Sequence, residues 1–220
     1  EIIVQDESCK IVFIGNTDES GEVTITHLPT GIYTFFESQA PKGYIQSSET
    51  KEFTIDRFGD VSGETQLYNE PTLLQIHKTK YEDGEPLSGA GFTVKGVLGI
   101  TTYTFSTTED GAYRYDKNGT ITEIPVDADG FAEIQGLPTG VYWLEETTVP
   151  IGYYPSAAQK VTISEENDTN NPYTITIPNS IYIKLGHDYR KLVYESVAGG
   201  FALLGFIAFF IIKRKRGKTK

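Results

Sequence analysis

The sequence predicts an all-β protein made of two copies of one unit, followed by a single membrane-spanning helix. Its 14 Tyr and 12 Phe residues, with Gly and Pro between short apolar runs, are typical of strands and turns. A long motif occurs twice at a fixed distance, which indicates a repeated structural unit. Residues 196–212 are apolar and uncharged, which is typical of a helix within a bilayer.

The repeated motif reads "LPTGIYTFFESQAPKGYI" at 28–45 and "LPTGVYWLEETTVPIGYY" at 137–154. Both copies fit LPTG-[IV]-Y-x-x-x-E-x-x-x-P-x-G-Y, with an offset of 109 (137 − 28). LPTG is similar to the LPxTG signal that sortases use to attach proteins to cell walls. Because such an address is not needed twice in mid-chain, we interpret LPTG as a turn in which Pro and Gly supply the backbone angles.

The offset and the composition together divide the chain into five parts. We expect a truncated β-sandwich unit over 1–71, a complete unit over 72–180, a linker over 181–192, a transmembrane helix over 193–212 and a basic tail over 213–220. The chain has no Met and opens without a signal peptide, so we expect it to be the C-terminal part of a longer polypeptide.

Charge is unevenly placed along the chain. The tail "KRKRGKTK" carries six positive charges, so the other residues sum to −17 (−11 − 6). By the positive-inside rule, this predicts a cytoplasmic tail and an extracellular acidic body anchored in the plasma membrane. A buried core helix is the alternative, but such helices are rarely followed by a cationic cluster. The acidic body also argues against a nucleic-acid partner.

Attachment to the cell wall is an open alternative to simple membrane anchoring. Residues 181–195 contain no LPxTG sequence, and the nearest similar stretch is "IPNSI" at 177–181. Simple membrane anchoring is the favoured interpretation.

One strand of the motif carries a glutamate on its inward face. In "GVYWLEET", alternation puts Tyr142, Leu144 and Glu146 on one side, and the first copy has Glu37 in the same place. An ionised carboxylate in an apolar row is unfavourable unless it is paired. Each glutamate is therefore either protonated or has a partner.

Two further strands of the second copy end an inward apolar row with a polar residue. "TLLQIHKTK" brings Lys78 to such a position, and "PYTITIPNS" brings Asn179. Burial lowers the pKa of a lysine and leaves a neutral nucleophile, while a carboxamide is an electrophile. Glu146 could polarise the carbonyl and relay protons. We therefore predict an amide cross-link between Lys78 and Asn179, formed once with loss of ammonia.

The first copy has only part of this set. Glu37 is followed by Asn69 at a spacing of 32 (69 − 37), close to the 33 (179 − 146) of the second copy. We expect the partner lysine upstream of residue 1. Lys10 is the alternative, although it belongs to a different strand.

These residues resemble a known family: the B-type repeat domains of Gram-positive collagen adhesins and the SpaA-like shaft pilins. The family's "E-box", YxLxExxxPxGY, is matched by Tyr142, Leu144, Glu146, Pro150, Gly152 and Tyr153, and its opening KxxxxxGxPLxGAxF by "KTKYEDGEPLSGAGF" at 78–92. The resemblance covers about residues 1–180. It implies tandem prealbumin-like (Ig-like) β-sandwich domains and a spontaneous Lys–Asn isopeptide bond assisted by the E-box glutamate. Lys80, where the family commonly has Asp, and Pro178, directly before the asparagine, depart from the pattern.

No other site is expected. Cys9 is the single cysteine, the three histidines are isolated, and "DADG" at 127–130 lacks the further acids of a calcium loop. We predict no metal and no cofactor.

The resulting hypothesis is a non-enzymatic stalk or pilin-like protein of the Gram-positive cell surface. Its expected partners are the membrane and other surface or pilin subunits. One alternative is an adhesin module that binds a host or matrix ligand through the longer segment 95–126. Another is the anchor stalk of a surface enzyme.

Overall fold

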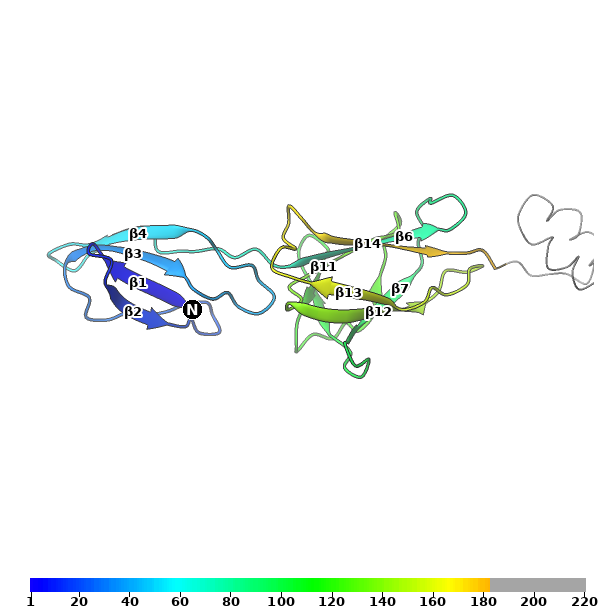
Figure 1. Ribbon diagram of the computed structural model, residues 1–220, viewed down its shortest axis with the longest axis horizontal. Helices are drawn as coiled ribbons and strands as arrows, with labels where there is room; N and C mark the ends of the chain where they lie inside the picture. The colour runs from blue at the N-terminus through cyan, green and yellow to red at the C-terminus, as the bar shows by residue number, and fades with distance from the viewer. Residues whose placement is uncertain (183–220) are drawn as a thin grey trace, which may run out of the picture. The chain divides into compact units, whose positions relative to one another are not determined.

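A computed structural model of the chain describes residues 1–182, and this part consists of β-strands joined by turns (Figure 1). The transmembrane helix expected over 193–212, the basic tail and nearly all of the linker lie outside the described residues. Within the described part, no helix is long and apolar enough to cross a membrane. The strands are β1 (Ile2–Asp6), β2 (Ile11–Gly15), β3 (Gly31–Glu37), β4 (Thr50–Ile55), β5 (Val61–Gly63), β6 (Leu73–Lys80), β7 (Gly91–Gly96), β8 (Phe105–Thr107), β9 (Tyr113–Tyr115), β10 (Ile124–Pro125), β11 (Phe131–Gln135), β12 (Gly140–Thr148), β13 (Gln159–Ile163) and β14 (Tyr173–Asn179).

The second repeat is a two-sheet sandwich. One sheet has the order β10-β7-β12-β13 and the other the order β14-β6-β11-β9-β8. Alternate side chains of the two inner faces form the core, as strand geometry requires. The core residues are Leu74, Ile76, Ala90, Phe92, Val94, Phe105, Ile124, Val126, Ala132, Ile134, Leu137, Tyr142, Leu144, Val161, Ile163 and Ile177.

Strand β6, the first strand of the second repeat, is an interior strand of its sheet and lies next to β14, the last strand of the repeat. It pairs antiparallel with β11 and parallel with β14, where Ile177 is the register partner of Lys78. The first and last strands of the sandwich are therefore direct neighbours. A parallel pair cannot be closed by a short turn, and here the whole domain forms the connection.

The first repeat has one well-formed sheet, of order β2-β1-β3-β4-β5, over a small core of Val4, Tyr33 and Phe35. The sequence "TDESGEVTI" at 17–25 has the pattern of a turn followed by a strand, and only the turn is present. The turn forms, since the Asp18 carboxylate accepts the backbone N–H of Ser20, but residues 22–26 are not a strand.

The missing strand has a physical reason. Residues 22–26 correspond to β11, and β11 forms its ladder with β6. The described residues of the first repeat contain no counterpart of β6, so a strand here has no partner for its backbone hydrogen bonds. Residues 64–69, which correspond to β14, lack strand structure for the same reason.

The long segment 95–126 is a structural part of the second sandwich. It supplies β8, β9 and β10, with β9 parallel to β11, and its Phe105 and Ile124 are fully buried. The segment does contain a hairpin, formed by the antiparallel pairing of β8 with β9, and this hairpin is built into one sheet of the sandwich. Its exposed residues include three large apolar ones near its start, Val97, Leu98 and Ile100.

The repeated LPTG motif is a turn fastened by the tyrosine that follows it. The Tyr142 hydroxyl donates to the Pro138 carbonyl at 2.5 Å, and Tyr33 donates to the Pro29 carbonyl at 2.8 Å. Burial raises the pKa of the Tyr142 hydroxyl and so keeps it a donor. The motif therefore positions the strand that carries the glutamate.

Candidate functional site: a buried lysine, glutamate and asparagine

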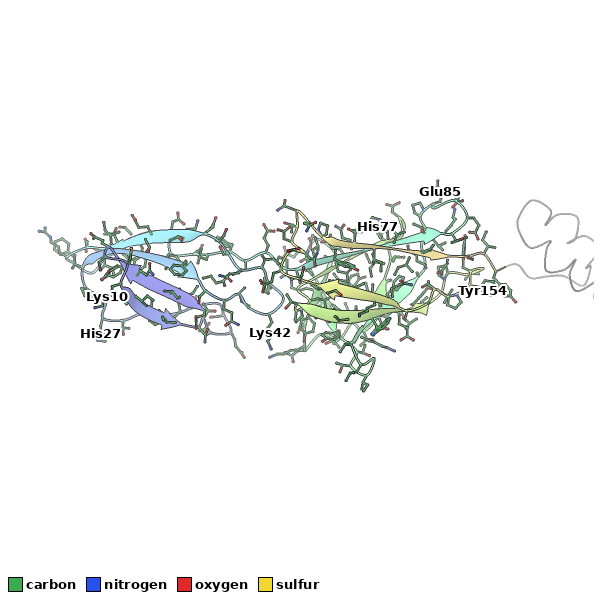
Figure 2. All side chains as sticks on the ribbon, viewed as in Figure 1. Lys10, His27, Lys42, His77, Glu85 and Tyr154 are labelled. Carbon is green, nitrogen blue, oxygen red and sulfur yellow. The ribbon has the colours of Figure 1, made fainter. Side chains whose placement is uncertain are left out.

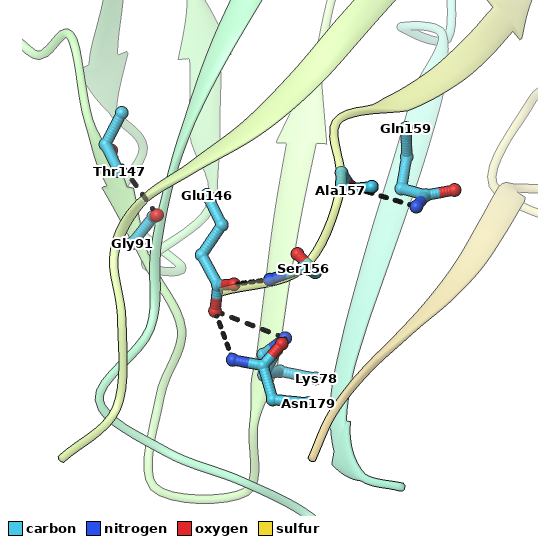
Figure 3. Close-up of polar contacts among 8 residues, drawn as sticks. All are labelled: Lys78, Gly91, Glu146, Thr147, Ser156, Ala157, Gln159 and Asn179. Atoms are coloured by element: carbon cyan, nitrogen blue, oxygen red, sulfur yellow. Dashed lines mark hydrogen bonds and ion pairs between the residues drawn. The ribbon is translucent and has the colours of Figure 1, made fainter. Parts of the chain in front are cut away.

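The structure brings Lys78, Glu146 and Asn179 together inside the second sandwich (Figure 3). The Lys78 Nζ lies 2.5 Å from the Asn179 Oδ1 and 3.2 Å from the Glu146 Oε1. The Asn179 Nδ2 donates to the same Glu146 oxygen at 2.8 Å. Each of the three residues comes from a different strand, β6, β12 and β14, at the end of an inward apolar row.

All three side chains are removed from solvent. Lys78 is 0 % exposed and Asn179 is 1 % exposed. Lysine is almost never fully buried without a partner, because transfer of its charge out of water is strongly unfavourable. A cluster of this kind is therefore either a costly structural feature or a reactive one.

The second carboxylate oxygen is fixed by the backbone. The Ser156 N–H donates to the Glu146 Oε2 at 2.6 Å, and the chain reaches this position through the Pro-x-Gly-Tyr turn. Gly152 in that turn has φ +89, which L side chains rarely adopt. The turn at the end of the E-box thus reverses the chain, so that the backbone N–H of Ser156 binds the Glu146 carboxylate and holds it in place.

Burial lowers the pKa of the Lys78 amine. The Glu146 carboxylate opposes this shift through its charge and through its contact with the amine, but loss of solvation has the larger effect. The neutral form of an amine is the nucleophilic form. In addition, Nζ lies 5.7 Å from the centre of the Phe92 ring, which forms part of the apolar wall.

The arrangement could support an amine attack on a carboxamide. A single oxygen, Glu146 Oε1, contacts both the nitrogen that would attack and the nitrogen that would leave. A group in that position can accept a proton from the first and donate one to the second. The fold also fixes the two reactants at contact distance, which removes most of the entropic barrier.

The first repeat contains the corresponding acceptor half of the cluster. The Asn69 Nδ2 donates to the Glu37 Oε2 at 2.5 Å, and the Ser47 N–H donates to the same oxygen at 2.9 Å. Glu37 is buried, at 6 % exposure. Among residues 1–182, no ion pair involves Glu37.

Lys10 does not supply the amine of the first repeat. It lies in the turn between β1 and β2, next to Asp6, and is labelled in Figure 2. Because β1 and β3 are antiparallel, Asp6 is opposite Tyr33, whereas Glu37 is opposite Ile2 at the other end of the strand. Lys10 and Glu37 therefore lie at opposite ends of the sheet.

The two departures from the family pattern leave the buried contacts in place. β14 is an edge strand, where Pro is tolerated, and the Pro178 side chain is exposed while Asn179 points inward. Lys80 lies near the surface, with its Nζ 4.0 Å from the Asp83 carboxylate. The stretch "IPNSI" does not suit a sortase site, because its Ile177 and Asn179 are buried.

Sequence reasoning missed the two serines that hold the glutamates. Ser47 and Ser156 act through their backbone N–H groups, so the type of residue at these positions does not indicate the role. In both copies the serine follows the glutamate by ten residues, and this equal spacing could have indicated the two serines.

The fold and the site together define a class of repeat domain: a β-sandwich with a buried lysine on its first strand and an asparagine on its last strand, both in contact with a buried glutamate. The SpaA prealbumin-like fold domain family matches residues 3–70 and 72–179, and the chain belongs to this family. No curated protein matches the chain.

Several solved structures are similar to parts of this chain. The TIE protein of Bacillus anthracis is 26% identical over 81% of this chain and 29% of its own, with a TM-score of 0.43. The minor pilin GBS52 of Streptococcus agalactiae is 22% identical over 79% of this chain and 70% of its own, with a TM-score of 0.45. The shaft pilin SpaA of Lactobacillus rhamnosus GG is 18% identical over 84% of this chain and 88% of its own, with a TM-score of 0.41. The chain thus spans less than a third of the length of the TIE protein.

Proposed function

We propose that this chain is a non-enzymatic, pilin-like stalk segment of a Gram-positive surface protein, whose second repeat is locked by a Lys78–Asn179 amide bond. The observation that carries the proposal is the fully buried Lys78 amine, in contact with both the Asn179 carboxamide and the Glu146 carboxylate. Membership of the SpaA domain family supports the stalk role.

The bond would form in one internal step of addition and elimination. A proton passes from the Lys78 ammonium to Glu146, which gives a neutral amine and a neutral acid. The amine nitrogen bonds to the Asn179 side-chain carbonyl carbon while the acid hydrogen-bonds to the carboxamide. The protonated acid then gives its proton to the leaving nitrogen, the C–N bond breaks and ammonia departs, and the Glu146 carboxylate takes the second proton from the attacking nitrogen to leave a neutral amide. No group outside the three residues is consumed, and the reaction does not turn over.

The bond suits a stalk because of where it joins the chain. β6 and β14 are the first and last strands of the second repeat and lie side by side in one sheet. A pulling force applied at the two ends of the repeat would pass through the covalent link between these strands. The described residues contain one cysteine, so no disulfide within them can provide this resistance.

Intact mass of the whole chain tests the proposal directly. The cross-linked protein is expected to weigh about 17 Da less than its sequence, because one ammonia is lost. Fragmentation of a proteolytic digest should then locate one branched peptide joining Lys78 to Asn179. Loss of water at the N-terminal glutamate gives a similar mass change, so the branched peptide is the deciding observation.

Two variants serve as a matched pair. Glu146→Gln keeps the size of the side chain but cannot relay protons as a carboxylic acid does, so the full sequence mass is expected. Lys80→Ala removes the neighbouring, partly exposed amine of the same strand and should leave the deficit unchanged. A full-mass parent chain, or a branched peptide that involves Lys80, would contradict the proposal.

The surface location and the anchor are part of the same proposal. The apolar residues 196–212 followed by six cations support a C-terminal membrane anchor with the acidic repeats outside the cell. Association with other pilin or surface subunits is the expected partnership.

A further inference from the structure

The end of the second repeat at which β14 finishes has an exposed apolar surface. Three separate segments meet there and are held by backbone hydrogen bonds. The Tyr81 N–H donates to the Asn179 carbonyl and the Tyr154 N–H donates to the Ser180 carbonyl, both at 2.9 Å. Tyr154 is labelled at this end in Figure 2. The exposed apolar and aromatic side chains, which we call the end patch, are Tyr81, Ile151, Tyr154 and Ile181.

The end patch has no part in the core of its own repeat. None of its four residues belongs to the core of the second sandwich. Ile151 is 101 % exposed and Tyr81 is 71 % exposed. Single exposed apolar residues are common, but four that are fixed side by side at one end of a domain are typical of an interaction surface.

The first repeat ends in the same turn, and the comparison shows what is different at the second. An added Cβ at Gly43 would lie 2.1 Å from the Gly136 carbonyl oxygen, so the backbone of the second repeat lies against that turn. At the equivalent Gly152, no atom of the described residues lies within 4 Å of an added Cβ. Ile151 also takes the place of Lys42, at the offset of 109 (151 − 42). The end of the second repeat is thus open and more apolar than the end of the first.

The sequence beyond this end indicates which surface the end patch would meet. Thirteen residues, 183–195, separate it from the apolar run 196–212 (195 − 182). Even when fully extended, thirteen residues span at most about 45 Å. A membrane anchor at 196–212 would therefore hold the end patch close to the bilayer at a high effective concentration. Tyrosine is enriched at membrane–water boundaries because its ring is apolar and its hydroxyl is polar.

Acidic residues beside the end patch decide which part of a bilayer it would contact. Glu82, Asp83 and Glu85 lie in the loop after β6, and the Ile181 N–H donates to the Glu82 carboxylate at 2.9 Å. These charges disfavour contact with anionic headgroups. The attraction that remains is burial of apolar side chains at the boundary between headgroups and acyl chains.

We propose that the end patch docks on the outer surface of the plasma membrane, with Ile151 inserted at the boundary between headgroups and acyl chains. The inference rests on the membrane anchor of the proposed function but not on the Lys78–Asn179 bond. Docking would give the second repeat a defined orientation on the bilayer, so that residues 183–195 alone would not set the direction in which the repeats extend.

A polarity-sensitive dye at position 151 tests the docking in the whole chain. Cys9→Ser removes the single native thiol, and Ile151→Cys then carries the dye. In phosphatidylcholine vesicles, spin-labelled lipid should quench this dye at least about threefold more strongly than a dye at a control position, because inserted side chains lie about 5–10 Å inside the interface.

Leu98→Cys is the matched control position. Leu98 is apolar, 81 % exposed and part of the same repeat. It follows β7 at the end of the sandwich where β12 begins, whereas Ile151 follows the other end of β12. A dye that entered the bilayer by its own affinity would be quenched equally at both positions.

A second variant and the lipid composition test the apolar character of the contact. A dye at Tyr81→Cys should be quenched more than the Leu98 control, and addition of Ile151→Ser should remove this difference. Phosphatidylglycerol in the vesicles should weaken quenching at 151, and added salt should restore it because salt screens the repulsion from the acidic loop. Quenching that increases with phosphatidylglycerol would show attraction by charge and would overturn the proposal.

Flotation of the same vesicles distinguishes this proposal from the preceding one. A chain that floats with the vesicles but shows equal quenching at 151 and 98 overturns the docking and leaves the anchor in place. A chain that does not float overturns the anchor and, with it, the docking. The intact mass of the same sample reports the Lys78–Asn179 bond independently of both.

Discussion

Removal of the electrophile, by Asn179→Ala, gives the most informative stability measurement. The Lys78 and Asn179 side chains are separated by 101 residues along the chain. A cross-link across a loop of that size restricts the unfolded chain by about 4.7 kcal/mol on the chain-entropy estimate. The variant also loses one hydrogen bond to Glu146, worth about 1–3 kcal/mol at a buried acceptor: Asn179 Nδ2 donates it before the reaction, and the amide N–H of the cross-link would donate it afterwards. We therefore expect a total loss of about 6–8 kcal/mol in the free energy of unfolding of the second repeat.

Urea unfolding followed by tryptophan fluorescence is the appropriate assay. The chain has one tryptophan, Trp143 on β12, so the emission reports on the second repeat and not on the first. The transition midpoint should fall by several molar, since m is about 1–3 kcal/mol per molar urea for a small domain. Asn171→Ala, at an exposed asparagine near the start of β14, is a suitable control and should change stability by less than about 1 kcal/mol.

The refuting result is quantitative. A loss of only about 1–3 kcal/mol would equal the value of the hydrogen bond alone and would show that no covalent constraint had been present. Unchanged Asn179→Ala stability would refute the structural argument as well, because the buried contacts themselves would then contribute nothing.

Three further predictions concern the support of the site. Gly130→Ala should destabilise the second repeat by about 3 kcal/mol or more, because φ is +70 and an added Cβ would lie 2.4 Å from the Lys78 carbonyl oxygen. Gly152→Ala, where φ is +89 but the space around the Cβ is open, should lose only about 1 kcal/mol. Equal losses of stability in urea titrations of the two variants would contradict the steric argument. In Asn179→Ala the Lys78 amine is free and burial lowers its pKa, so the unfolded state binds more protons than the folded state between that lowered pKa and 10.5. The stability of this variant should therefore rise with pH in that range, by at most about 1.4 kcal/mol per pH unit. The cross-linked parent has no such amine, and identical pH profiles of the two proteins would be inconsistent with the bond. Tyr142→Phe removes the hydrogen bond that fastens the LPTG turn and should lower stability by about 1 kcal/mol with the mass deficit retained, whereas a full-mass variant would show that this turn is needed for the reaction.

Much of the fold follows from period and repetition in the sequence. Alternation with period two correctly assigned Tyr142, Leu144 and Glu146 to an inward face, because side chains of a strand must alternate. It gave the same result for Lys78 and Asn179 at the ends of their rows. The internal offset identified Glu37 as the equivalent of Glu146, and a similar spacing to the next asparagine identified Asn69 as the equivalent of Asn179. The structure places Glu37 and Asn69 in contact.

The sequence alone did not determine which segments would find a partner. The patterns at 22–26 and 65–69 are strand patterns, yet these segments are not strands, because a ladder needs a neighbour and local sequence does not encode one. Segment 95–126 shows the opposite case. Its sequence has no clear strand pattern, yet Phe105 and Ile124 are buried in the core.

Residue types and spacing thus determined the chemistry available to this protein: an amine, an acid and a carboxamide, each at the inward end of a strand. Only the tertiary structure decided that Lys78, Glu146 and Asn179 meet. The parallel pairing of β6 with β14 brings the lysine and the asparagine together, and the turn after β12 places the Ser156 N–H on the Glu146 carboxylate. The physical reason is that contact between residues 101 positions apart depends on the packing of the whole sandwich. In the first repeat, the packing of residues 1–182 brings Glu37 and Asn69 into contact in the same way.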